Sequence, residues 1–338
     1  MSQSSRPTLR QLAKHLDLSV TTVSRALKNG AEVNAQTIAR VQSTAEALGY
    51  IVNRTGQALR TGRSNVLAAM LPLETRSYLS DIARLPLIEG MTIAAQARGY
   101  ALTVHSSPPE ENSLEALARI VSLGLSDGII ITRMLADDPR PDWLAQRHVP
   151  FVSFGRSSLD PQNGSRHDYI DIDNAAIARE ATKQLIAEGH RRIALQVLDH
   201  RDLASQDRIN GYCEALTEGG LQVDPDLVCD QHFDMERARA SLDRLLDMPT
   251  PPSAMVCVSE LGLLGALAAL RRRNLLPEHS FELISRDNTG MANYLGLPVR
   301  AQMVDMVAVG QALAEALITR IETPQSAPIK RLIQPASL

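Results

Sequence analysis

Residues 8–25 read TLRQLAKHLDLSVTTVSR, and this stretch decides the fold of the N-terminal part of the chain. Apolar residues recur at helical spacing in its first half: Leu9, Leu12, Ala13 and Leu16. The pattern breaks at residues 17–18, and a second helix is expected from Ser19, whose hydroxyl can accept from the amides of a first turn. Two short helices at this spacing predict a helix-turn-helix, whose second helix lies in a DNA major groove.

The second helix is expected to expose a face of groups that reach bases and phosphates: Val20, Thr21, Ser24 and Arg25. The alternative is a pair of amphipathic helices with no role on DNA. A third helix, AQTIARVQSTAEAL, follows Asn34 as its N-cap and ends at Gly49. Four apolar residues at helical spacing are expected to close a three-helix core: Ile38, Val41, Ala45 and Leu48.

A longer pattern decides between these interpretations. The run S-x-x-T-V-S-R-x-L from Ser19 is followed, from Asn34, by NxxxxxRVxxxAxxLGYxxNRxxxxLRTG. It resembles the headpiece and hinge of the LacI/GalR family of transcription regulators. The resemblance, together with the predicted helix-turn-helix, assigns DNA contacts to the following residues: Leu9, Ser19, Val20, Thr21, Thr22, Ser24, Arg25, Asn29, Asn34, Asn53, Gly56, Leu59 and Arg60.

Residues 50–63, YIVNRTGQALRTGR, are short, basic and poor in apolar surface, so they are expected to be loose without DNA. In the family this segment forms a hinge helix on operator DNA, where a leucine wedges into the central base step of the minor groove. Leu59 occupies that place, and apolar wedges are a general way to kink DNA. The alternative is that Leu59 merely packs in a linker.

Charge is divided unevenly along the 338 residues. Residues 1–63 hold nine basic and three acidic residues, a net charge of +6, whereas the remaining 275 carry 26 basic and 35 acidic, or −9. A basic head on an acidic body fits a polyanion-binding module joined to a separate domain. Three widely spaced cysteines suit neither a disulfide framework nor a zinc site, and no signal peptide or membrane span is recognisable. We therefore expect a cytoplasmic protein with reduced thiols.

From residue 64, short β-branched runs alternate with amphipathic helices, which indicates parallel sheets flanked by helices. The predicted fold is α/β: a three-helix headpiece at 1–49, a hinge at 50–63, and a core at 64–338 with the two lobes of a periplasmic-binding-protein-like fold. The resemblance implies that the chain crosses between the lobes. Lobe 1 is expected at about 64–160 and 290–321, and lobe 2 at about 161–289 and 322–338.

Two core motifs also match the family. EGHRRIALQ places His190 in a turn before a buried strand, where a structural role is expected. DRINGYCEAL carries R-x-x-G-[YF]-x-x-A-L, and its arginine, Arg208, is the common effector contact of the family. A guanidinium can hold two adjacent hydroxyls or a carboxylate in fixed geometry, although Arg208 can also be a solvated helix residue. The full set of expected effector contacts is Arg208, Asp287, Phe233, Tyr78, Arg156 and Glu260.

The core departs from the family at positions that face the ligand. Ser259-Glu260 replaces the usual Asn-Asp pair, and Ser285-Arg286-Asp287 keeps only the acid of a glycine-aromatic-Asp turn. Gly155-Arg156 follows the strand PFVSF. Effector identity therefore cannot be carried over from a relative.

The predicted function is a ligand-responsive transcriptional regulator, most often a repressor, that controls carbohydrate uptake or catabolism and binds near-palindromic operator DNA as a homodimer. A sugar is the expected effector, with a nucleobase or nucleoside as the alternative, and a solute-binding protein is a less favoured class. No nucleophile-elbow, P-loop or metal-ligand motif is present, so neither enzymatic activity nor a cofactor or metal is expected. A dimer is favoured over a tetramer because no leucine heptads follow the expected last strand.

Overall fold

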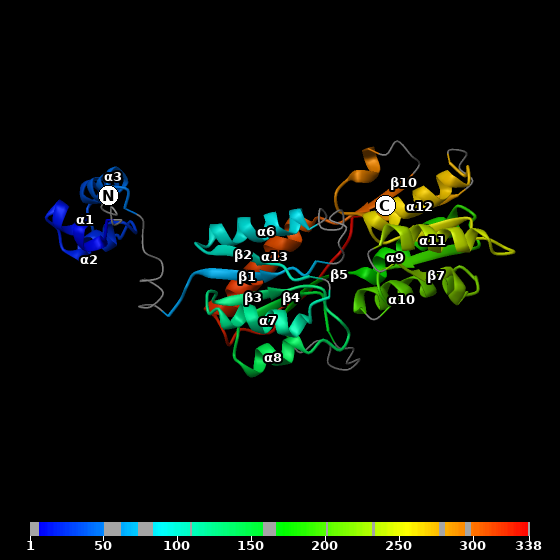
Figure 1. The fold of residues 1–338 in the computed structure, drawn as a ribbon, viewed down its shortest axis with the longest axis horizontal. Coiled ribbons are helices and arrows are strands. Elements are labelled where there is room, and N and C mark those ends of the chain that lie inside the picture. The colour runs from blue at the N-terminus through cyan, green and yellow to red at the C-terminus, as the bar shows by residue number, and fades with distance from the viewer. Residues whose placement is uncertain are drawn as a thin grey trace. The chain divides into compact units, whose positions relative to one another are not determined.

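The computed structural model describes residues 7–50, 62–73, 84–108, 110–157, 167–200, 202–231, 234–276, 281–294 and 299–336. The chain divides into two compact units, residues 1–64 and 65–338 (Figure 1). No helix among the described residues is long and apolar enough to cross a membrane.

The first unit contains three short helices: α1 (Leu9–Leu16), α2 (Val20–Ala26) and α3 (Ala35–Ala47). Thr8, Ser19 and Asn34 cap them, each side chain accepting from a first-turn amide. The bend after α1 is made by Asp17, whose φ of 53° is left-handed, a conformation that Asp tolerates better than most residues. The helix-turn-helix that the sequence predicts is therefore present.

The headpiece core lies between the three helices and contains Leu12, Leu16, Val23, Val41 and Ala45. One expected member, Leu48, is not part of it. Its side chain is 39% exposed, because it follows the last turn of α3 rather than lying within the helix.

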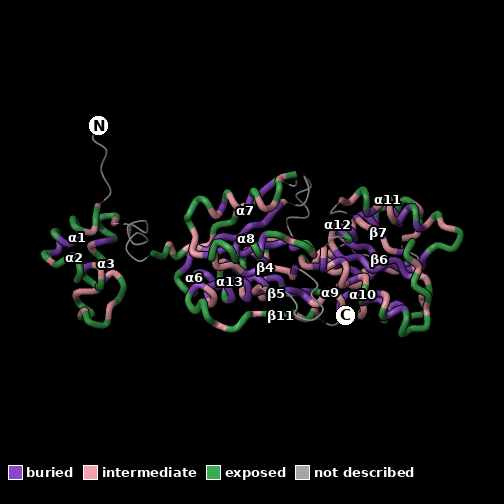
Figure 2. The backbone as a smooth tube through the Cα atoms, turned by 90° about the horizontal axis from the view of Figure 1, so that it is seen from below, coloured by how far each residue is buried: buried purple, intermediate pink, exposed green. Residues whose placement is uncertain are grey.

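In the second unit, lobe 1 is built on a six-stranded, wholly parallel sheet. Its order is β11 (Lys330–Ile333), β5 (Tyr169–Ile172), β4 (Phe151–Phe154), β3 (Gly128–Ile131), β1 (Val66–Met70) and β2 (Ala101–His105). Successive residues of β1 face opposite sides: Leu67 and Ala69 pack with α6 (Leu85–Ala97) and α13 (Met306–Glu322). Ala68 and Met70 pack with α7 (Ser113–Ser122) and α8 (Arg140–Gln146). The central strands β1 and β3 are thus buried on both faces, whereas the edge strands β2 and β11 are more exposed (Figure 2).

Lobe 2 repeats this architecture with a five-stranded parallel sheet. Its order is β10 (Val299–Met303), β9 (Glu282–Asp287), β8 (Ala254–Cys257), β6 (Ile193–Val197) and β7 (Val228–Asp230). Helices α9 (Asn174–Ala187) and α10 (Leu203–Glu218) cover one face, and α11 (Met235–Leu246) and α12 (Glu260–Arg272) cover the other. Short 3-10 turns occupy Pro225–Leu227 and Met291–Tyr294. Cys229 and Cys257 are buried, and all three cysteines are free.

The lobe boundaries differ from those expected. Strands β5 and β11 pair with each other in the sheet of lobe 1, and β10 pairs with β9 in lobe 2. The chain therefore crosses between lobes after β5, after β10 and after β11, rather than near residues 161, 290 and 322. Short strands such as YIDI and KRLI carry no local signal of which sheet they join, because only the register with their neighbours decides it.

Candidate functional site

The exposed face of α2 in the headpiece carries the side chains expected to read DNA. Val20 is 42% exposed, Thr21 and Arg25 are exposed, and Ser24 is half-buried. Arg25 pairs with Glu32 across 3.1 Å, at the C-terminal end of the helix. An exposed ion pair of this kind contributes little to stability, so the guanidinium remains available to a base or phosphate.

Several other expected DNA contacts also have structural roles. Leu9 packs against the headpiece core, and Ser19 caps α2, with the amide of Thr22 donating to its hydroxyl across 3.0 Å. Asn34 caps α3. Asn29 has a left-handed φ of 56°, and its side chain accepts from Gln42. The expected hinge contacts lie outside the described residues: Asn53, Gly56, Leu59 and Arg60.

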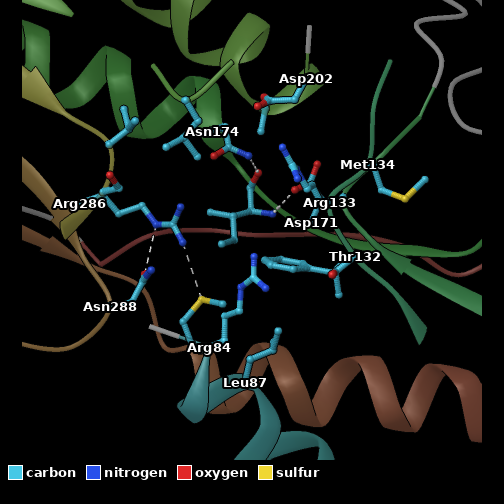
Figure 3. A pocket seen from close by; sticks show the side chains of 18 of the residues that line it. Arg84, Leu87, Thr132, Arg133, Met134, Asp171, Asn174, Asp202, Arg286 and Asn288 are labelled. Atoms are coloured by element: carbon cyan, nitrogen blue, oxygen red, sulfur yellow. Dashed lines mark hydrogen bonds between the residues drawn. The ribbon is translucent and has the colours of Figure 1, made fainter. Parts of the chain in front are cut away.

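In the core unit, a cavity of about 200 Å³ opens between the two lobes, beside the carboxyl ends of β3, β4, β5, β8 and β9. Open parallel sheets bind ligands at this edge. The cavity is rich in charge, because its lining includes five arginines and three acidic residues: Arg84, Arg133, Arg156, Arg208 and Arg286, with Asp171, Asp202 and Glu260. Figure 3 shows Arg84 and Arg286 reaching into this space from different elements.

Arg208 is placed by α10 and is only 2% exposed. Its Nη2 donates to Asn174 Oδ1 across 2.6 Å, whereas Nε and Nη1 have no partner among the described residues. Burial lowers the pKa of Arg208 to about 10, with the nearby charge of Arg286 acting in the same direction. Buried donors without partners cost about 1–3 kcal/mol each, so two donors of this guanidinium are left unsatisfied beside the cavity. The solvated-helix alternative does not fit this burial.

Arg156 also lines the cavity, but its guanidinium is already paired. Nε donates to Asp171 across 3.0 Å, and Nη2 pairs with Asp207 of α10. Since Arg156 follows a strand of lobe 1, the pair with Asp207 links the two lobes. Burial raises the pKa of Asp207 to about 6, although Arg156 opposes this effect. Arg156 therefore holds the lobes together beside the cavity.

Asp287, an expected effector contact, is not among the residues that line the cavity. Its Oδ1 accepts from the amide and hydroxyl of Thr289, and its Oδ2 from the amide of Ala292. These bonds, together with complete burial, assign Asp287 to shaping the loop after β9. Glu260 does line the cavity and accepts from the amide of Asn288. Phe233 and Tyr78 lie outside the described residues.

Sequence reasoning missed several lining residues. Asn174, the partner of Arg208, is the first residue of α9 and lies two positions after the end of β5, and Asn288 is the first residue after β9. A polar residue within two positions of the end of a strand was the signal available for both. Arg286 was recognised only as a departure from the family pattern, and Arg84 and Arg133 gave no signal.

His190 does not line this cavity. Its Nδ1 is 2.8 Å from Ser253 Oγ, and it gathers with Glu188 and Glu282. Arg300 pairs with both of those carboxylates, so a cation already occupies the cluster.

Comparison with known proteins fits both units. Residues 64–334 match the family model described as periplasmic binding proteins and sugar binding domain of LacI family. The chain belongs to the LacI family. This LacI-family protein is 33% identical over 313 residues to the HTH-type transcriptional regulator AglR of Rhizobium meliloti, covering 92% of this chain and 86% of that one. It is 27% identical to the HTH-type transcriptional regulator CelR of Thermobifida fusca, over 99% of this chain and 97% of that one.

Solved structures agree. The structure titled transcriptional regulator CelR–cellobiose complex has 26% identity and a TM-score of 0.73, over 98% of both chains. A lac repressor dimer bound to operator shares the fold, with a TM-score of 0.82 at 21% identity, over 98% of this chain and 97% of that one. This LacI-family protein is therefore a DNA-binding transcriptional regulator that responds to a ligand, and not an enzyme.

Proposed function

We propose that the protein is a homodimeric, cytoplasmic repressor of carbohydrate uptake or catabolism genes, whose interlobe cavity binds a carbohydrate. The observation that carries the proposal is the buried guanidinium of Arg208, with two nitrogens left without partners among the described residues at the cavity. Such a group can donate to adjacent hydroxyls of a sugar ring. The CelR relative in the cellobiose complex aligns along nearly the whole chain, which supports the same ligand class here.

A nucleobase or nucleoside is less well supported. A flat base is usually held by stacking against aromatic rings, and Phe154 is the one aromatic side chain among the described lining residues. The lining includes eight charged side chains, and four further polar side chains join them, which suits a ligand with many hydroxyl groups: Thr132, Asn174, Ser259 and Asn288.

The proposed mechanism couples the cavity to the headpiece by a shift of population. The ligand touches groups of both lobes, so it favours one relative position of the lobes over another. In the dimer this shift moves the two copies of lobe 1 against each other and disfavours the ordered hinge on DNA. Such a response requires that the ligand bind the two states with different affinity.

The dimer is proposed to form through α6 and the neighbouring edge strand β2. Leu85 and Ile93 lie two turns apart on α6 and are 60% and 44% exposed, and Val104 on β2 is 44% exposed. An apolar helix face beside an open sheet edge is suited to a second copy of the same surface. Two headpieces related by twofold symmetry would read a near-palindromic operator.

A thermal-shift screen of the full chain against mono- and oligosaccharides, nucleobases and nucleosides tests the proposal. We expect a carbohydrate to raise the unfolding midpoint, because a ligand that binds only the folded state stabilises it. The same ligand should change the affinity of the protein for operator DNA selected from a random pool. A shift with nucleosides and none with carbohydrates would refute the carbohydrate assignment.

A further inference from the structure

Two of the five arginines that line the cavity, Arg208 and Arg286, form no ion pair with a carboxylate among the described residues. Arg156, in contrast, pairs with two carboxylates. Arg208 has one amide partner, that of Asn174. Arg286 donates through Nε to Asn288 Oδ1 at 3.2 Å, and its Nη2 reaches only the sulfur of Met306.

Burial lowers the pKa of both guanidinium groups. The positive charge of Arg286 lowers the pKa of Arg208 further. Three carboxylates near Arg208 raise its pKa, but none of them pairs with it: Asp202, Asp171 and Asp207. Glu260 and Asp171 likewise raise the pKa of Arg286 without an ion pair to it among the described residues. Two like charges in a site of low dielectric are costly unless an opposite charge joins them.

We propose that the effector carries an anionic group, a carboxylate or a phosphate, and that Arg208 and Arg286 hold this group between them. The inference rests on the proposed function and refines it, since it narrows the ligand from carbohydrates in general to acidic ones, such as sugar acids or sugar phosphates. Arg286 is the residue that sets this specificity.

A neutral sugar satisfies this pair of arginines less well. Hydroxyl groups can accept from the free nitrogens of Arg208, but they leave the repulsion between the two guanidinium groups unchanged. A carboxylate or phosphate oxygen forms charge-assisted hydrogen bonds, which are roughly twice as strong as neutral ones, and cancels the repulsion. The planar fork of each arginine also matches the geometry of these anions.

The test is a calorimetric titration of the full chain at constant ionic strength. The probes are inorganic phosphate, glucose, galactose, glucuronate, galacturonate and glucose 6-phosphate. The proteins are wild type, Arg286→Gln, Arg286→Lys and Arg147→Gln. Arg147 is exposed at the end of α8 beside Trp143, so its variant loses the same charge away from the cavity. The thermal unfolding midpoint of each variant establishes that it folds. If Arg286→Gln does not fold, Arg286→Lys still tests the site, because it keeps the positive charge but loses the planar guanidinium.

We expect phosphate and at least one acidic sugar to bind wild type, the acidic sugar more tightly than its neutral parent. Arg286→Gln should raise the dissociation constant roughly 10- to 100-fold, from the loss of hydrogen bonds to a charged group. Arg286→Lys should restore part of the affinity, and Arg147→Gln should leave it unchanged. Whether glucuronate or glucose 6-phosphate is preferred distinguishes a carboxylate from a phosphate.

Three results would overturn the inference. The first is that neither phosphate nor any acidic sugar binds. The second is that the neutral parent sugars bind as tightly as the acidic sugars or more tightly, and that Arg286→Gln does not change the affinity. The third is that Arg147→Gln weakens binding as much as Arg286→Gln does. The second result leaves the proposed carbohydrate function intact. Phosphate binding that depends on Arg286, without binding of any sugar, would instead support the anion site and contradict the carbohydrate assignment.

Discussion

Gly211 on α10 lies directly against the backbone of Ala175 on α9, where a Cβ at position 211 would come within 2.1 Å of the Ala175 carbonyl oxygen. Close approach of the two helices requires glycine here. The same approach brings Arg208, one turn before Gly211, to Asn174 at the start of α9. The spacing of arginine and glycine in the R-x-x-G motif therefore has a physical cause: the glycine sets the helix contact that positions the arginine.

Replacing Gly211 with alanine should destabilise the core and weaken effector binding. The added methyl group must push α10 away from α9, and overpacking of this kind costs typically about 1–3 kcal/mol. Urea unfolding of the full chain measures the loss. Asn210→Ala is the matched control, because Asn210 is exposed on the same helix. Equal stability of the Gly211 variant and the control would show that the helices can separate freely.

His167 should make the stability of the core depend on pH. Its Nε2 is 2.8 Å from Ser153 Oγ, and burial lowers its pKa to about 4, below the roughly 6.5 of an unfolded histidine. Between these values the unfolded chain binds the extra proton, so the free energy of unfolding falls as the pH drops from about 6.5 toward 4.

His167→Gln should remove that part of the pH dependence. Urea unfolding of both proteins at pH 7 and pH 5 measures it, and we expect the variant to lose less stability on acidification than wild type. An identical loss in the two proteins would mean that His167 titrates normally.

Arg25→Ala should weaken specific operator binding roughly 10- to 100-fold while the core stays folded. Arg25 is exposed at the end of α2, and a good bidentate contact to a base contributes about 1–3 kcal/mol. Gel-shift titration measures the affinity, with Ser43→Ala on the exposed face of α3 as the control. Wild-type affinity in the Arg25 variant would remove this residue from the DNA-reading face.

Ile93→Glu should dissociate the proposed dimer. A charge without a partner in an apolar interface costs at least the roughly 1–3 kcal/mol of an unpaired polar group. The twofold interface contains two copies, so the dissociation constant should rise about 30-fold or more. Light scattering over a dilution series reads the oligomeric state. Leu125→Glu provides the control, since Leu125 is 64% exposed in the loop after α7, away from α6. A monomeric wild type, or equal effects of the two substitutions, would argue against dimerisation through α6.

The headpiece was predictable because its signals are local. Caps at Ser19 and Asn34 and the turn at Asp17 depend on residues three or four positions apart, and all appear as expected. The alternation of strands and helices in the core was predictable for the same reason. Sheet membership was not, because β5, β10 and β11 are assigned by pairing with strands distant in the sequence.

The cavity was predictable only in part. Arg208, Arg156 and Glu260 do line it, as expected from the family pattern and from its departures. Asp287 does not, because its oxygens are used by the backbone of its own loop, and a sequence cannot show that a carboxylate is already occupied. Arg286 was recognised only as a departure from the family pattern, because an arginine in a strand gives no sign of whether a carboxylate will pair with it.

Operator titrations of wild type and Arg208→Ala, with and without the carbohydrate that gives the largest thermal shift, test whether the interlobe cavity is the effector site. The DNA is the site that the full chain selects from a random pool. We expect wild type to change its operator affinity when the carbohydrate is added, and Arg208→Ala to bind the operator with wild-type affinity but not to respond, because the headpiece is unchanged. If Arg208→Ala responds to the carbohydrate with an unchanged midpoint, the interlobe cavity is not the effector site.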